Sequence, residues 1–187
     1  MAIKTFTSGE VLTASDTNTY LANAGLVFIA ESIITAGSST VTVSNCFSNT
    51  YRRYKIMIES KVSTGGGTQG LIFTPNVGNS GNYSSIIAQT ATSATLTGTN
   101  SAAQTYYLVG FGGNNQMYIE IDNYAPRTGA GANGSLRWSS YDSSNSTGGS
   151  GSMWSTNNSL NTGFTFQSGG GYTLGAGSIT VYGYRTT

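Results

Sequence analysis

The sequence contains no histidine and only one cysteine. Without histidine the chain has no Ser-His-Asp or Cys-His catalytic set, no histidine metal ligand and no side chain whose unperturbed pKa lies near neutrality. The single cysteine, Cys46, excludes an internal disulfide and a cysteine-rich zinc site. The stability of the fold therefore has to come from packing, from backbone pairing or from assembly.

Charge is also scarce. Only 8% of the residues are charged, with 8 Lys and Arg against 7 Asp and Glu and a formal net charge of +1, whereas an ordinary soluble domain has roughly 25% charged residues. No stripe of Lys and Arg is present, so we expect no nucleic acid partner. No apolar run is long enough to span a bilayer, and the N-terminus lacks the apolar stretch of a signal peptide, so we expect no membrane insertion.

Small polar and aromatic residues are abundant instead. Gly, Ser, Thr and Asn make up about half of the chain, against a usual share of roughly a quarter. Aromatic residues account for 11% of the chain, and 12 of them are tyrosines, which argues against a disordered protein. A length of 187 residues is sufficient for one well-buried domain.

The first 25 residues differ from the rest of the chain. Thr13 is placed to cap the N-terminus of a helix, and Asp16 brings a carboxylate to the positive end of that helix. We expect the helix to cover about residues 14–24 and to end near Gly25. Because so short a helix with few apolar side chains is marginal in isolation, we interpret residues 1–25 as an arm that packs on another surface.

From residue 26 onward, apolar and polar residues alternate with the period of a β-strand. Within residues 117–122 the apolar side chains are predicted to face the core, while Tyr118, Glu120 and Asp122 face outward. The other predicted strands lie at residues 26–34, 40–43, 51–62, 71–74, 83–89, 94–97, 104–111, 136–141, 152–155, 163–167 and 178–184.

Clusters of Gly, Asn and Ser separate these segments, and residues 143–151 are predicted to be one such turn region. Many short strands with turns of this kind are typical of a sandwich or a barrel. We predict an all-β protein, an antiparallel jelly-roll-like β-sandwich. The sandwich is predicted to occupy residues 26–187 and to follow the arm of residues 1–25.

Glu120 and Asp122 project from the same side of one predicted strand. Two carboxylates on an antiparallel sheet are compatible with the acid and base of a glycosidase, or with a Ca²⁺ site. They are equally compatible with a solvated strand face, or with ion pairs to Lys55 or Lys61 on a neighbouring strand. We favour the structural interpretation, because a glycosidase needs its acids on two sides of the bond. We predict no catalytic residue, no metal site and no cofactor.

Trp138, Tyr141 and Trp154 bracket the Ser- and Gly-rich segment 142–151. Aromatic side chains beside polar loops are typical of surfaces that stack on a sugar or contact a protein, so we take these three as candidate ligand or partner contacts. The alternative is that both tryptophan rings lie in the core. Cys46 is predicted to be a small buried apolar side chain.

Residues 6–21, which read FTSGEVLTASDTNTYL, resemble the N-terminal segment of many tailed-phage virion proteins. The shared order is an aromatic residue, then Gly, then Leu-Thr-Ala, then Asp and Asn. Residues 177–184 are similar to the last strand of β-sandwich domains in the same group, and residues 47–51, followed by Tyr54 and Ile56, are similar to the entry of their second strand. Together these segments cover about a fifth of the chain.

The resemblance implies a homotrimer without enzymatic activity, attached to the particle through its N-terminal arm. It also implies that the partners are further copies of the chain and other virion proteins, of the tail or of the capsid shell. The protein would be made in the host cytoplasm and would end on the particle surface. The residues that we assign to anchoring and assembly are Phe6, Leu12, Asp16, Asn18, Tyr20 and Leu21.

Three functions follow as alternatives. The first is a tail fibre or tail appendage that contacts a glycan or a protein of the host surface. The second is a capsid decoration, or cement, protein that stabilises the phage head, because fibres usually carry a longer shaft than this sequence offers. The third is a glycan-active enzyme that uses Glu120 and Asp122.

Overall fold

The computed structural model describes residues 7–11, 13, 25–63, 69–76, 82–90, 96–104, 107–112, 116–126, 133–141, 146–154 and 160–184. In these residues every regular secondary-structure element is a β-strand. This confirms the predicted all-β class. No helix that is suited to crossing a membrane occurs among them. The helix expected over residues 14–24 lies outside the described residues.

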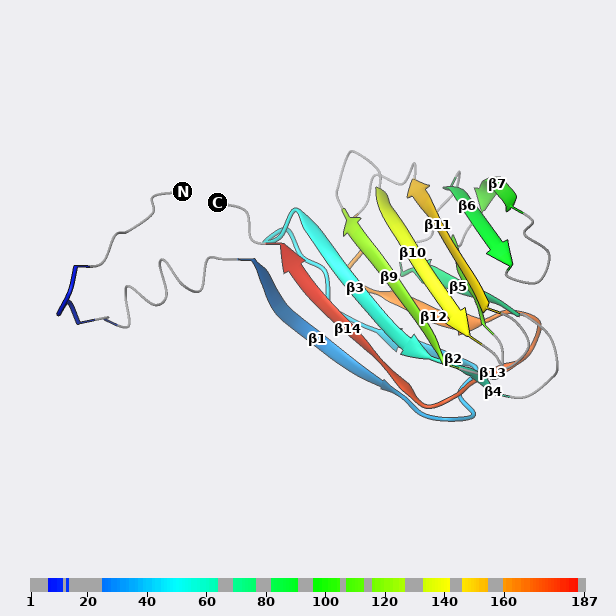
Figure 1. Ribbon diagram of the computed structural model, residues 1–187, viewed down its shortest axis with the longest axis horizontal. Helices are drawn as coiled ribbons and strands as arrows, with labels where there is room; N and C mark the ends of the chain where they lie inside the picture. The colour runs from blue at the N-terminus through cyan, green and yellow to red at the C-terminus, as the bar shows by residue number, and fades with distance from the viewer. Residues whose placement is uncertain are drawn as a thin grey trace.

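An eight-stranded antiparallel sheet forms one layer of the fold (Figure 1). Its order is β1-β14-β3-β9-β10-β11-β6-β7, so that the earliest and the latest described strands of the chain pair with each other. In this order the strands span Leu26–Ile34, Gly177–Tyr184, Arg53–Ser60, Met117–Tyr124, Asn133–Tyr141, Ser146–Trp154, Asn82–Thr90 and Leu96–Gln104.

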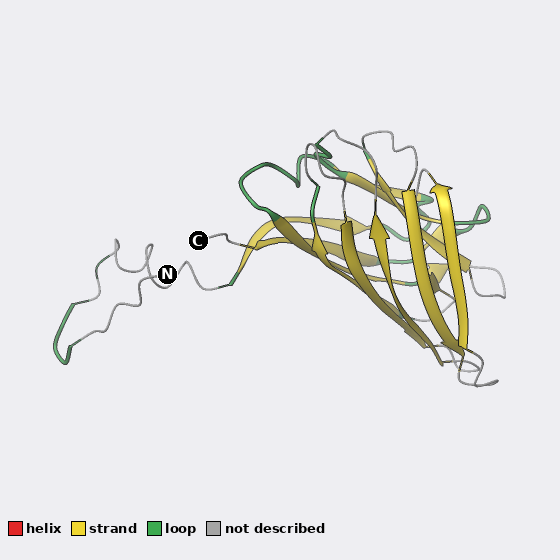
Figure 2. Cartoon of the chain, turned by 90° about the horizontal axis from the view of Figure 1, so that it is seen from above, coloured by secondary structure: helices red, strands yellow, loops and turns green. Residues whose placement is uncertain are grey.

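A four-stranded antiparallel sheet of order β2-β12-β5-β8 forms the second layer (Figure 2). The chain passes repeatedly from one sheet to the other, directly at β1–β2, β2–β3, β5–β6, β7–β8, β8–β9 and β11–β12, and through the ribbon strands β4 and β13 between β3 and β5 and between β12 and β14. This alternation is what a jelly-roll-like sandwich requires, and the predicted antiparallel sandwich is confirmed. A two-stranded ribbon joins β13 to β4. The bounds are Thr40–Val43, Phe164–Ser168, Gln69–Pro75 and Tyr107–Gly112 for the sheet, and Thr173–Leu174 and Val62–Ser63 for the ribbon.

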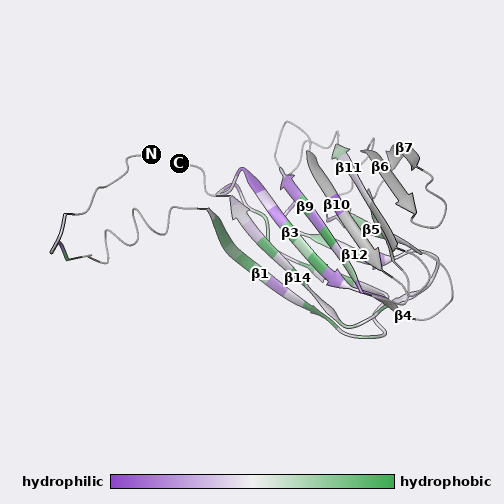
Figure 3. Ribbon diagram, in the orientation of Figure 1, coloured by the Kyte–Doolittle hydropathy of each residue, from purple (hydrophilic) through white to green (hydrophobic). Residues whose placement is uncertain are grey.

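The core lies between the two sheets, and β3 and β9 supply much of it. Ile56 and Ile58 of β3 are fully buried, as are Ile119 and Ile121 of β9. The register sets Ile56 opposite Ile121 and Ile58 opposite Ile119, so the four side chains share one face of the sheet. Figure 3 shows the apolar residues of β3, β9 and β14 in neighbouring positions. The predicted inward and outward faces of residues 117–122 are confirmed.

Five aromatic side chains form the centre of this core. Phe73 and Phe164 of the small sheet stack with ring centroids 4.6 Å apart. Phe47 lies 5.7 Å from Phe164 and 4.8 Å from Tyr54, and Tyr124 lies 5.3 Å from Phe73. Aromatic pairs of this geometry contribute about 0.5–1.5 kcal/mol beyond the burial of their area. Because Tyr54 and Tyr124 belong to the large sheet, the cluster joins the two layers.

Cys46 belongs to the same buried cluster and is 2% exposed. Burial raises the pKa of its thiol to about 12. The thiol therefore stays protonated at neutral pH, and a protonated buried thiol is a poor nucleophile. The prediction of a small buried apolar side chain is confirmed.

The turn region predicted over residues 143–151 is wrong for residues 146–151. These residues form the first part of β11, which pairs with β10 on one side and with β6 on the other. Gly148, Gly149 and Gly151 have a low intrinsic preference for strands. A place between two neighbouring strands overrides that preference, because both sides of the backbone gain ladder hydrogen bonds there.

Candidate functional site

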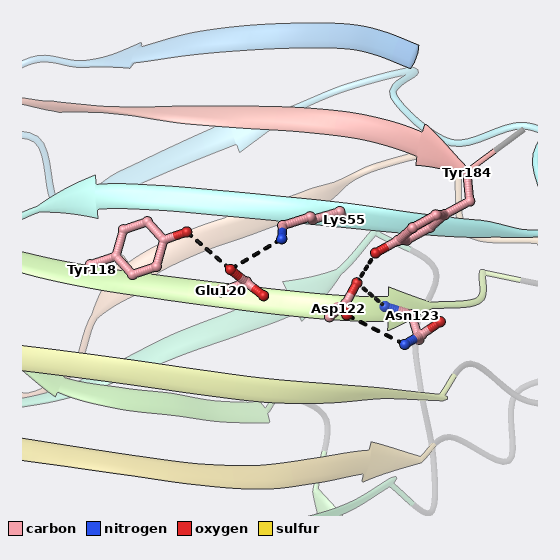
Figure 4. A network of polar contacts seen from close by, with 6 residues as sticks. All are labelled: Lys55, Tyr118, Glu120, Asp122, Asn123 and Tyr184. Carbon is pink, nitrogen blue, oxygen red and sulfur yellow. Dashed lines mark hydrogen bonds and ion pairs between the residues drawn. The ribbon is translucent and has the colours of Figure 1, made fainter. Parts of the chain in front are cut away.

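A network of charged and polar side chains covers the outer face of β14, β3 and β9 (Figure 4). The Nζ of Lys55 lies 3.2 Å from the Oε2 of Glu120, and the hydroxyl of Tyr118 donates a 3.1 Å hydrogen bond to the same oxygen. The Lys55 and Glu120 side chains are 21% and 20% exposed, so solvent screens this pair less than a fully exposed one. The interpretation of Glu120 as a partner for a lysine of the neighbouring strand is confirmed.

Asp122 is held by a second set of donors at the other end of the network. The hydroxyl of Tyr184 donates to Oδ1 of Asp122, and the backbone N–H of Asn123 donates to the same oxygen at 3.0 Å. The side-chain amide of Asn123 reaches Oδ2 at 3.4 Å and accepts a 2.9 Å hydrogen bond from Arg53. The three strands β14, β3 and β9 are therefore tied together through one carboxylate and its neighbour.

The backbone at this end of the network is irregular. Asn123 has a φ of 55°, in the left-handed region that asparagine tolerates better than most residues. The register between β3 and β9 also shifts between Tyr54 and Ile56. Bulges and left-handed residues of this kind re-aim side chains. Here the irregularity lies beside the network's Arg53–Asn123 contact.

The two tyrosine hydroxyls of the network are harder to ionise than usual. Burial, reinforced by the hydrogen bond to Asp122 and by its charge, raises the pKa of Tyr184 to about 12. Burial, followed by the hydrogen bond to Glu120 and the charges of Glu120 and Glu59, raises the pKa of Tyr118 to about 12. Both hydroxyls thus remain donors to their carboxylates throughout the neutral range.

We expect the stability of the fold to decrease at alkaline pH because of these tyrosines. The pKa of tyrosine in an unfolded chain is about 10, whereas the pKa of Tyr184 in the folded chain is about 12. Since the folded value is the higher one, the contribution is complete below about pH 10 and is lost as the pH rises to about 12. The measurement is the urea midpoint as a function of pH for the native chain and for Asp122→Asn, which should show a weaker decrease.

The matched control for this experiment is Glu31→Gln, which removes one carboxylate from the exposed part of β1. Its pH dependence should follow that of the native chain. An Asp122→Asn variant that loses stability as steeply as the native chain would show that the Asp122–Tyr184 contact does not set the alkaline limit.

Glu120 and Asp122 project from the same face of β9, at successive outward positions. Each carboxylate accepts a hydrogen bond from a tyrosine hydroxyl. They therefore do not flank a space in which a glycosidic bond would lie between them, as a glycosidase pair does. Within the described residues no group of three or more His, Cys, Asp and Glu is arranged to hold a metal ion.

The three candidate aromatic contacts lie along one hairpin, β10 and β11. Trp138 takes a register position opposite Ile119 and Gly149. Tyr141 stands opposite Ser146 at one end of the hairpin, and Trp154 stands opposite Asn133 at the other end. The strand from residue 133 to residue 141 is about 27 Å long, so the backbone does not bring the three residues to one point. Their part in ligand contact stays a prediction.

The described part of the arm contains a compact turn. The N–H of Glu10 donates to the carbonyl of Thr7 at 3.0 Å, and the N–H of Thr7 donates to Oε2 of Glu10 at 3.1 Å. The turn is exposed. The residues assigned to anchoring and assembly lie outside the described residues, namely Phe6, Leu12, Asp16, Asn18, Tyr20 and Leu21.

No family model, no curated protein and no solved structure matches this chain. Its function has to be inferred from the chemistry and the geometry of its own residues.

Strand β1 forms one edge of the large sheet and exposes three large apolar side chains. Leu26 is 42% exposed, Phe28 58% and Ile33 68%. The ring of Phe28 packs edge-on against Tyr182 at 6.1 Å, which extends the apolar surface onto β14. Proteins protect such an edge with charged residues, proline or bulges. Strand β1 has one exposed charge, Glu31, and a register shift between Phe28 and Ala30, but no lysine or proline. The edge therefore has the features of a contact surface.

Proposed function

We propose that this chain is a non-enzymatic structural protein of a tailed-phage particle. A homotrimeric β-sandwich is displayed on the particle surface, the N-terminal arm anchors it, and as a tail fibre or other tail appendage it contacts the host surface. The resemblance of residues 6–21 to virion proteins supports the assignment to a particle. The observation that supports assembly is the exposed apolar edge of β1, a strand that begins directly after the arm.

The apolar edge supports assembly on energetic grounds. Fully burying a Leu, Ile or Phe side chain stabilises a protein by about 1.5–3 kcal/mol relative to leaving it in water. Leu26, Phe28 and Ile33 lack much of this stabilisation in the single chain, because their side chains are exposed to water. A neighbouring chain that covers β1 would recover it and would also satisfy the unpaired backbone groups of the edge. In the proposal, β1 and the arm together form the attachment side of the protein.

Deletion of residues 1–25 tests the anchor. We expect the shortened chain to fold, because all the described strands begin at Leu26 or later. We expect it to be missing from purified particles, because the anchoring segment has been removed. The measurement is the copy number per particle by quantitative mass spectrometry, with circular dichroism of the isolated protein to check the fold.

The matched control is Ser8→Ala, a single exposed change in the turn of the arm, which should be incorporated normally. A shortened chain that is incorporated as well as the native chain would contradict the anchor. The native copy number separates the two structural roles: a few copies per particle support a tail appendage, and a number near that of the shell protein supports head decoration. Absence of the native chain from the particle would refute both.

A further inference from the structure

A cleft of about 280 Å³ opens where β3 ends and β14 begins. This volume approaches the lower end of the range for small-molecule sites, about 300 Å³. Charged and polar side chains supply much of its lining, together with the small residues Ala176 and Gly177. The residues at its mouth and walls include Glu59, Lys61, Gln116, Ala176, Gly177 and Ser178.

Close backbone packing forms the walls of the cleft. A Cβ at Gly177 would collide with the carbonyl of Glu59, so β14 and β3 approach here as only glycine permits. A Cβ at Gly175 would lie 2.8 Å from Cε of Lys61, which shows that the lysine side chain lies across the glycine backbone. The N–H of Gly175 also donates a 2.6 Å hydrogen bond to the carbonyl of Lys61. The stem of the exposed Lys61 side chain therefore lies against Gly175 at the edge of the cleft.

The polar side chains of the cleft are available to a ligand. Within the described part of the chain, no hydrogen bond or ion pair engages the side chain of Glu59, Lys61 or Gln116. Glu59 supplies a hydrogen-bond acceptor, Lys61 a charged donor, and Gln116 one group of each kind. Because Glu59 and Lys61 carry opposite charges, the attraction of either one for an ionic ligand is offset by the repulsion of the other, and neither an anion nor a cation gains net attraction from the pair. An uncharged ligand with many hydroxyl groups meets no such opposition.

The cleft continues into the network on the outer face of the large sheet. Glu59 stands opposite Tyr118 in the register of β3 and β9. From there the polar side chains follow β9 to Glu120 and Asp122 (Figure 4). We call the cleft and this row the β9 strip. It carries three carboxylates and three cations, namely Arg53, Lys55, Glu59, Lys61, Glu120 and Asp122. The exposed Arg137 of β10 stands opposite Glu120 beside it, so charges of both signs alternate along the strip.

We infer that the β9 strip is a binding site for a neutral oligosaccharide whose terminal ring occupies the cleft. Hydroxyl groups of a sugar both donate and accept hydrogen bonds, which suits the acceptor of Glu59, the donor of Lys61 and the amide of Gln116. Along the row, a carboxylate offers about four lone-pair sites, and the contacts of Tyr118 and Lys55 with Glu120 use only its Oε2. The rings of Tyr118 and Tyr184 add half-buried aromatic surface along the row. The inference rests on the proposed function in one respect, since it names the ligand class that the displayed sandwich would contact.

The experiment uses the full chain and calorimetric titration with tetrasaccharides of glucose, galactose and N-acetylglucosamine. We expect saturable binding of at least one of them. The double variant Glu59→Gln with Lys61→Gln should weaken that binding about 10- to 100-fold, the effect of losing hydrogen bonds to charged groups. A second variant, Ala176→Trp, fills the cleft while every charged residue remains, and it should weaken binding to a similar extent.

The matched control is Glu31→Gln, which removes an exposed carboxylate of the same sheet outside the β9 strip and should bind like the native chain. Three results would overturn the inference: no saturable binding at about 10 mM sugar, where a millimolar site is filled; undiminished binding by both cleft variants; or binding of a sialylated tetrasaccharide alone. The copy number of the double variant in particles keeps the two proposals apart. Normal incorporation without sugar binding would refute the ligand and leave the structural role in place.

Discussion

Replacement of Phe164 by alanine is expected to lower the free energy of unfolding by about 3–5 kcal/mol. Phe164 is fully buried in β12 and stacks on Phe73 and Phe47. Removing its ring leaves a cavity at the centre of the aromatic cluster, where paired strands on both sides limit how far the neighbours can move. A loss of this size is a large part of the roughly 5–15 kcal/mol that stabilises a typical domain. Urea denaturation followed by circular dichroism measures it.

The neighbouring residue provides the matched control. Thr165 faces outward from the same strand, and its hydroxyl lies 3.3 Å from the hydroxyl of Thr42. Thr165→Ala therefore removes one exposed hydrogen bond and leaves the core intact, and we expect a loss below about 1 kcal/mol. If the two variants were equally stable, the aromatic cluster would not be the centre of the core.

The alternation of residues was sufficient to predict the fold class and the most regular strands. In residues 117–122, apolar side chains alternate with long polar ones, and only an extended chain with one buried face explains this pattern. The ion pair between Lys55 and Glu120 could be predicted for the same reason, because each residue lies on the outward face of a strand with a strong alternation. Where side chains alternate clearly, local sequence determines which face is buried.

The strand at residues 146–151 was missed because its residues are small and carry no alternation. What makes it a strand is pairing with β10 and β6, and β6 comes much earlier in the sequence. The hydrogen bond from Tyr184 to Asp122 could not be predicted from the sequence, for a related reason. It depends on β14 lying beside β3 and β3 beside β9, an order that local propensity does not encode. The cleft beside Gly177 depends on the same order.

Replacement of Gly177 by alanine is expected to lower the free energy of unfolding by about 3 kcal/mol, near the upper end for overpacking. The added methyl group would overlap the carbonyl of Glu59 and lie 2.9 Å from Cα of Ser60. Both contacts are to the backbone, which cannot rotate away as a flexible side chain can. The start of β14 would therefore have to separate from the end of β3, and those two ends also form the wall of the cleft. Chemical denaturation measures the stability, and sugar titration reports on the cleft.

Gly37→Ala makes the same chemical change without the collision. Gly37 has a φ of 90° and no atom within 4 Å of an added Cβ, so the cost is backbone strain alone, about 1–2 kcal/mol. The difference between the two variants isolates the close approach of β14 to β3 from the general cost of replacing a glycine. Equal losses would mean that the strands have room at Gly177 and that the cleft is not held in shape by their contact. A larger loss at Gly177, together with weakened sugar binding, would make this strand junction a requirement for both the fold and the ligand site.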